Sequence, residues 1–104
     1  MIIGLVLTIP QNSSRYQAGY ERGVNFIDQG NYRQAVTQLT NSISLNPDYA
    51  EAYLARGIAQ RLQGDYQAFI RDYQEAVLAY RRRGDVLQAE SVQDALGKSR
   101  VPGN

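Results

Sequence analysis

The side chains that could do chemistry in this sequence are carboxylates, arginines, tyrosines and serines, because none of its 104 residues is Cys or His. This excludes thiolate or imidazole metal ligands, His-activated nucleophiles and the usual proton carrier near neutral pH. A glycine-rich phosphate loop is also lacking. Helix caps and exposed helix faces explain the acidic candidates better than an acid–base pair does: Asp28, Asp65, Asp72 and Asp94. The sequence therefore predicts no catalytic residue, no metal site, no cofactor and no enzyme activity.

The basic side chains do not point to a polyanionic partner. The formal net charge is only +1, so no overall field would recruit nucleic acid or an anionic membrane. Residues 81–83 form an Arg-Arg-Arg run, which is typical of a solvated helix end favoured by the helix dipole. An anionic contact, the alternative, would need more basic neighbours than Asp85 and Glu90 allow. We expect no nucleic-acid partner.

The elements that would position these side chains are helices, and they repeat. A shift of about 34 residues, the length of one helical repeat, superimposes Gly23 on Gly57 and Tyr32 on Tyr66. Apolar periodicity and helix breakers predict helices over residues 14–29, 31–45, 48–63, 65–83 and 85–97. The predicted N-terminal caps are two capping boxes, Ser14 with Gln17 and Asp48 with Glu51, and two single residues, Asn31 and Asp65.

Residues 1–9, MIIGLVLTI, form an apolar segment that Pro10 ends. The segment is far shorter than the roughly 20 residues of a membrane-spanning helix, so we expect no direct span. It lacks the basic start and small-residue cleavage site of a signal peptide, although a signal remnant remains an alternative. We expect residues 1–13 to be an extended arm and linker that packs on the repeats or docks on a partner or second copy. The contact residues of the arm would be Ile2, Ile3, Leu5, Val6 and Leu7.

From residue 16 to about residue 96 the sequence resembles the tetratricopeptide repeat family. The family positions matched in the first unit are Gly23, Phe26, Ala35, Leu39 and Pro47, and those in the second unit are Tyr53, Gly57, the turn at 64–66, Tyr73 and Ala76. The resemblance implies an all-α, right-handed superhelical array of antiparallel helix hairpins. About two such units and a C-terminal capping helix would occupy residues 14–98, followed by a polar tail at 99–104. The departures from the family pattern are Gly19, Gln60, Phe69 and Arg81.

The repeat pattern also predicts how the helices pack. Gly23 would face Ala35, which lets the first pair of helices approach closely. Gly57 would face Phe69, whose ring would occupy the space left by the glycine, so we expect the second hairpin to be slightly splayed. Because Arg81 stands where the family has proline, we expect the fourth helix to run on through the arginine run. The fifth helix would be a solvating cap with an inward set of Leu87, Ser91, Val92, Ala95 and Leu96.

In this family the concave surface is lined mainly by the first helix of each unit. Similarity places Gln17, Tyr20, Val24, Ile27 and Asp28 there from the first unit, Glu51, Leu54, Ile58, Arg61 and Leu62 from the second, and Gln88, Val92 and Ala95 from the cap. Apolar residues replace the Lys, Asn and Arg with which some relatives clamp a C-terminal carboxylate, so we expect no such clamp. The apolar lining could alternatively be the core of a short array. Tyr20 and Tyr49 are the better binding candidates among the tyrosines, since Tyr53, Tyr66 and Tyr73 fall at packing positions.

The expected function is a non-catalytic protein–protein interaction module. It would bind an apolar peptide or segment of a protein partner in the concave groove and could self-associate through the arm as a homo-oligomer. The alternative is a small structural or assembly subunit that the arm anchors to a larger, membrane-embedded or soluble, complex. An RNA-binding repeat would require a basic groove, which the sequence does not predict. A cytoplasmic location is favoured, with membrane association through a partner as the other option.

Overall fold

The computed structural model describes residues 11–98, with side chains from Arg15 onward. The predicted arm contacts, Ile2 to Leu7, and the tail at 99–104 lie outside the described residues. Every regular element within 11–98 is a helix, which confirms the all-α class. The helices are α1 (Gln11–Asp28), α2 (Tyr32–Leu45), α3 (Ala50–Leu62), α4 (Tyr66–Arg82) and α5 (Val86–Lys98). None of the helices in this part of the chain combines the length and apolar character needed to cross a membrane.

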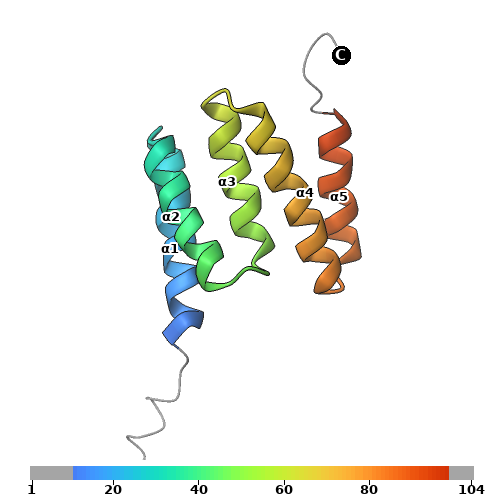
Figure 1. Cartoon of the computed structure of the whole chain (residues 1–104), viewed down its shortest axis with the longest axis horizontal. Helices are drawn as coiled ribbons and strands as arrows, with labels where there is room; N and C mark the ends of the chain where they lie inside the picture. Colours follow the sequence, from blue (N-terminus) through green and yellow to red (C-terminus); the bar gives the residue numbers. More distant parts are fainter. Residues whose placement is uncertain (1–10, 99–104) are drawn as a thin grey trace, which may run out of the picture.

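The helices pack in chain order as a row of antiparallel neighbours (Figure 1). Each helix contacts the next one along the chain, and α1 also contacts α3. Nearest-neighbour packing of this kind is the architecture of helical repeat proteins, in which each hairpin is stabilised by the hairpins beside it. The contact between α1 and α3 places two first helices of successive hairpins side by side, and the candidate site forms there.

Three of the four turns between the helices contain a glycine with a positive φ. Gly30, Gly64 and Gly84 have φ values of +79°, +90° and +81°, a conformation that side chains with a Cβ rarely adopt. The residue after each glycine donates its backbone N–H to the carbonyl five residues earlier, as Asp65 does to Gln60 at 2.9 Å. This bond satisfies a carbonyl that the helix end would otherwise leave without a partner. The predicted ends of α1, α3 and α4 are therefore correct to within one residue.

The predicted caps are only partly right. Asp65 caps α4, because its Oδ1 accepts the backbone N–H of Ala68 at 3.1 Å. Asn31 occupies the cap position of α2 but makes no side-chain cap bond. Both capping boxes are wrong: α1 begins at Gln11, before Ser14, and the cap residue of α3 is Tyr49. Asp48 instead donates its backbone N–H to Asn46 Oδ1, which closes a turn before α3.

The close crossings of the hairpins lie at Gly23 and Gly57, but the predicted partners are wrong. A Cβ added to Gly23 would lie 2.5 Å from Leu39 Cγ, and one added to Gly57 would lie 2.9 Å from Tyr73 Cδ1. Leu39 and Tyr73 each follow the predicted partner by about one helical turn. The large side chain of the second helix, rather than Ala35 or Phe69, fills the space that each glycine leaves.

The core consists of two clusters joined through α3. The first packs Ala35 and Leu39 of α2 against small residues of α3, namely Ala52, Ala55 and Ala59. The second joins α3, α4 and α5 through Ala50, Ala76, Val77, Ala79, Tyr80, Ala89 and Val92. Alanine is prominent in both clusters, which allows neighbouring helices to approach closely. Tyr53 and Tyr73 pack on the second cluster as predicted, whereas Tyr66 is 43% exposed and does not.

Fewer residues of α5 face inward than the sequence predicted. Ala89 and Val92 are buried, and Ala95 and Leu96 are half-buried. Leu87 is 82% exposed and Ser91 is also exposed, so their predicted inward position is wrong. Within the described residues α5 contacts only α4, and a single stripe of small residues is enough for that contact. Ala89 was missing from the prediction.

Asp72 lies inside the second hairpin, not on an exposed helix face as predicted. The residue is 5% exposed, and its carboxylate accepts two N–H bonds from Arg56, both at 2.8 Å. The bond to Asp72 raises the pKa of Arg56 above its ordinary value, against the effect of burial. Pairing in this two-pronged geometry lets a carboxylate and a guanidinium be buried together.

We expect the crossing at Gly23 to resist even one added methyl group. Gly23→Ala should lower the free energy of unfolding by about 1–2 kcal/mol, because overpacking against buried Leu39 outweighs the gain in helix propensity. Gly97→Ala is the matched control, since its Cβ would have no neighbour within 4 Å, and it should be neutral or stabilising. Urea denaturation measures both. In a Leu39→Ala background, Gly23→Ala should become stabilising. If Gly23→Ala lowers the free energy of unfolding in both backgrounds, Leu39 is not the side chain that the added methyl group meets.

Candidate partner-binding groove

A groove of about 350 Å³ runs between α1 and α3. Its apolar lining comes from both helices, and a carboxylate from each helix adjoins it. The lining residues are Tyr20, Val24, Ile27 and Asp28 of α1 and Glu51, Leu54, Ala55 and Ile58 of α3. The structure thus brings together most of the residues predicted for the concave surface, and it adds Ala55.

The remaining predicted concave residues do not line this groove. Gln17 is exposed, and Leu62 is 49% exposed beyond the end of the lining. Arg61 is directed toward α4, where its guanidinium carbon lies 5.4 Å from the centre of the Phe69 ring. In α5, Val92 is buried in the second core cluster, so it offers no groove surface.

The groove residues have a double role because they are only half-buried. Tyr20, Val24 and Ile27 pack against the first core cluster with one side and line the groove with the other. Their spacing puts them on one face of α1, and Leu54 and Ile58 have the same spacing one repeat later. The same side chains therefore contribute both to the core and to the lining of the groove.

Three tyrosines hold the two walls of the groove together. The ring of Tyr49 lies edge-on to Tyr16 and Tyr20, with ring centres 4.8 and 5.2 Å apart. The pKa of Tyr49 is raised to about 12, mainly because the ring is partly buried, and nearby Tyr20 and Glu51 raise it further. Such edge-to-face pairs stabilise packing beyond the area they bury. Tyr49 thus joins α1 to the start of α3, while Tyr20 also faces the groove.

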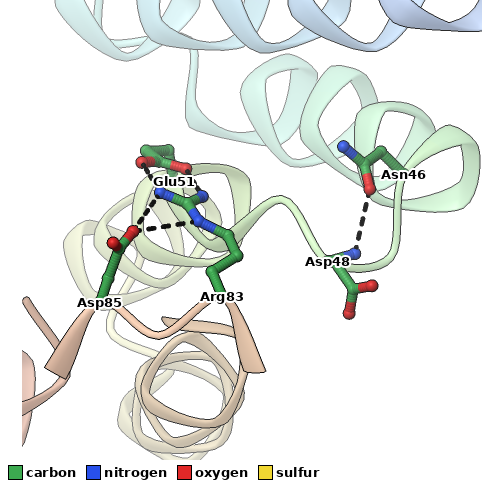
Figure 2. A network of polar contacts seen from close by, with 5 residues as sticks. All are labelled: Asn46, Asp48, Glu51, Arg83 and Asp85. Carbon is green, nitrogen blue, oxygen red and sulfur yellow. Dashed lines mark hydrogen bonds and ion pairs between the residues drawn. The ribbon is translucent and has the colours of Figure 1, made fainter. Parts of the chain in front are cut away.

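The acidic group at one end of the groove is already paired. Arg83 lies between Glu51 and Asp85, with bonds of 2.9 and 3.3 Å to the oxygens of Glu51 and 2.7 Å to Asp85 (Figure 2). Burial would raise the pKa of Glu51, but the hydrogen bond and charge of Arg83 bring it below its ordinary value. Arg82 likewise pairs with Asp48 at 2.8 Å. The arginine run is thus exposed as predicted, but Arg82 and Arg83 form ion pairs that the sequence did not reveal.

At the other end of the groove lies the carboxylate of Asp28, which is not neutralised by an ion pair in the described chain. Asp28 is exposed at the end of α1. The described residues also contain no cluster of acidic side chains that could hold a metal ion. The arrangement is suited to binding: an apolar trough with a negative charge at one end.

This geometry, two hairpins with close glycine crossings and a lined concave side, defines a helical repeat protein. The family model described as Tetratricopeptide repeat matches residues 20–85, so the chain belongs to the tetratricopeptide repeat family. The Mus musculus protein named Tetratricopeptide repeat protein 36 is 34% identical over 88 residues. That match covers 84% of this chain and 47% of the relative, so the chain spans about half the relative's length. Members of this family are generally non-catalytic scaffolds for protein–protein interaction.

The pairing of Glu51 with Arg83 predicts a pH-dependent stability. Because the pKa of Glu51 is lowered in the folded chain, its contribution is fully present above about 4.5 and is lost as the pH falls through the folded value. Glu51→Gln should therefore lower stability at neutral pH, by no more than about 1 kcal/mol for a part-exposed pair. Urea midpoints of both proteins should converge in acid. Asp94→Asn, in an exposed pair with Lys98, is the control and should show no such convergence.

Proposed function

We propose that the groove between α1 and α3 binds an apolar segment of a protein partner. The observation that carries this proposal is the half-exposed apolar lining contributed by two helices from different hairpins. A surface of this kind gains free energy when a partner removes it from water. Family membership supports a protein as the partner class.

The groove dimensions and charge specify the segment further. From Tyr20 to Asp28 the lining of α1 extends about 12 Å along the helix axis. That length accommodates about four residues of an extended peptide or about two turns of a helix. Glu51 is neutralised by Arg83, whereas Asp28 has no such partner in the described chain. We therefore propose an apolar segment with a Lys or Arg at the end that lies beside Asp28.

Polar substitutions in the groove should weaken this binding. Leu54→Gln and Ile58→Gln should each reduce partner affinity about tenfold or more, because an amide would be buried without a hydrogen-bond partner. Leu87→Gln is the matched control, since Leu87 is 82% exposed on α5, and it should have no effect.

The partner segment would be identified first by a photo-crosslinker placed at residue 54, read by mass spectrometry. Calorimetry with the corresponding synthetic peptide then gives the affinity of each variant, and circular dichroism checks that each variant is folded. Equal losses in the Leu54 and Leu87 variants, or crosslinks that do not depend on the apolar residues of the peptide, would rule out the groove as the site.

The predicted apolar arm, residues 1–9, is a second occupant that the sequence itself supplies. We propose that it competes for the groove, in its own chain or in a second copy. Deletion of residues 1–10 should then change the mass in solution or increase the binding of an apolar dye, and Leu54→Gln should abolish the difference. A variant with Ile2, Leu5 and Leu7 all replaced by serine is the matched comparison, because it keeps the chain length. If mass, stability and dye binding are unchanged by both, the arm is not an occupant.

A further inference from the structure

A hollow of about 460 Å³ lies between α1 and α2. Arg15, Ala18, Gly19 and Arg22 of α1 line it together with residues of α2 that include Asn41 and Leu45. With 3.6 residues per turn, these α1 positions face away from the groove residues Tyr20, Val24 and Ile27. The hollow is therefore separate from the proposed groove, and its occupation does not depend on what binds there.

The second hairpin shows what normally fills this place. Gly19 has Tyr53 as its counterpart, about 34 residues later. The half-buried Tyr53 packs on the cluster that contains Ala79, the counterpart of Leu45, and its hydroxyl donates to the Pro47 carbonyl at 3.1 Å. Gly19 has no side chain to take that position. The first hairpin therefore lacks an aromatic ring where the second has one.

The arginine beside the hollow differs from its counterpart in the same way. Arg56 lies 5.8 Å from the centre of the Tyr53 ring and pairs with the carboxylate of Asp72. The counterpart Arg22 donates from Nε to Gln38 Oε1 at 2.8 Å, and both contacts link residues 16 positions apart. Arg22 thus has a neutral amide in place of the carboxylate and empty space in place of the ring.

A second guanidinium strengthens the positive character of the hollow. Arg15 precedes Arg22 by two helical turns on the same face, so the two side chains start about 10 Å apart. None of the residues that line the hollow is acidic, and neither arginine forms an ion pair within the described chain. Glu21, the nearest acid along α1, is not part of the lining.

We propose that this hollow binds an aromatic side chain of a protein partner that is flanked by a carboxylate. The ring occupies the position that Tyr53 fills in the second hairpin and stacks against Arg22. The adjacent carboxylate pairs with Arg22 and Arg15, which supplies the charge that Gln38 does not. The segments outside the described residues, 1–10 and 99–104, contain no aromatic residue, so neither of them supplies the ring.

The test uses the full chain labelled with ¹⁵N and a blocked synthetic peptide in which Asp-Tyr-Asp stands between Gly-Ser flanks. Titration should shift the Gly19 backbone amide and the Arg22 Nε–H signal, with a dissociation constant in the micromolar to millimolar range. Control peptides with Asn-Tyr-Asn or Asp-Ala-Asp at the centre should bind at least about tenfold more weakly.

Two variants restore features of the second hairpin and should weaken peptide binding. Gly19→Tyr supplies the ring and should abolish peptide binding; its Cβ would lie 3.3 Å from the Gln38 carbonyl oxygen, so a small shift of α2 is needed. Gln38→Asp supplies the carboxylate without crowding and should weaken binding about tenfold, which keeps the test decisive if the first variant does not fold. Arg33→Gln, exposed on α2 outside the hollow, should change nothing.

Several results would overturn the proposal. They are the absence of shifts at millimolar peptide, equal binding of the Asn-Tyr-Asn peptide, and shifts confined to the Leu54 and Ile58 amides. Tyr66 follows Asp65 and is 43% exposed, so a second copy could also offer such a ring. If the chain self-associates without peptide and Tyr66→Ala abolishes that association, the occupant of the hollow is a second copy of this chain. That result would overturn the proposal of a different protein as partner.

Discussion

The absence of a side chain at Gly23 and Gly57 is the constraint on which the rest of the structure depends. At each position the second helix of a hairpin brings a large side chain, Leu39 or Tyr73, to where a Cβ would otherwise be. Because both crossings use the same register, residues one repeat apart occupy matching environments. This matching places Tyr20 and Val24 beside Leu54 and Ile58, so that two separate hairpins form one continuous trough. It also allows one hairpin to serve as an internal reference for the other.

The two hairpins differ in the partners that each provides for its own equivalent arginine. In the second hairpin Arg56 has a carboxylate partner and an aromatic neighbour, and both come from the same hairpin. In the first hairpin the equivalent arginine has a neutral amide and no ring. Two open surfaces of the described chain therefore lie on α1, an apolar trough on one face and a cationic hollow on the other. The second hairpin is tied to α5 by the larger core cluster, whereas α1 packs mainly on α2 and also contacts α3.

Most of the fold could be predicted from the sequence, because helix periodicity, glycine stops and the repeat spacing are local properties. Most of the groove lining could be predicted because the family resemblance assigns the inner surface to the first helix of each unit, and helical spacing then gives the residues that share that face. Properties that depend on the register between helices could not be predicted in this way. The partners of Gly23 and Gly57 were one turn away from those expected, and Leu87 lies on the outer side of α5. The burial of Asp72 has a signal in hindsight, because its neighbours on the inner face of α4, Phe69 and Ala76, are apolar.

The tyrosine contacts between α1 and α3 have an optical consequence. The sequence has eight Tyr, two Phe and no Trp, so its near-ultraviolet absorption and intrinsic fluorescence come mainly from phenol rings. Tyr16, Tyr20 and Tyr49 meet where the two hairpins join, which makes this junction a main source of the asymmetric environment that gives aromatic circular dichroism. With its pKa raised to about 12, Tyr49 stays protonated in alkaline solutions that ionise exposed phenols. Separation of the hairpins can thus be followed in the unlabelled chain as a loss of that dichroic signal, and as ionisation of Tyr49 at a lower pH than in the folded chain.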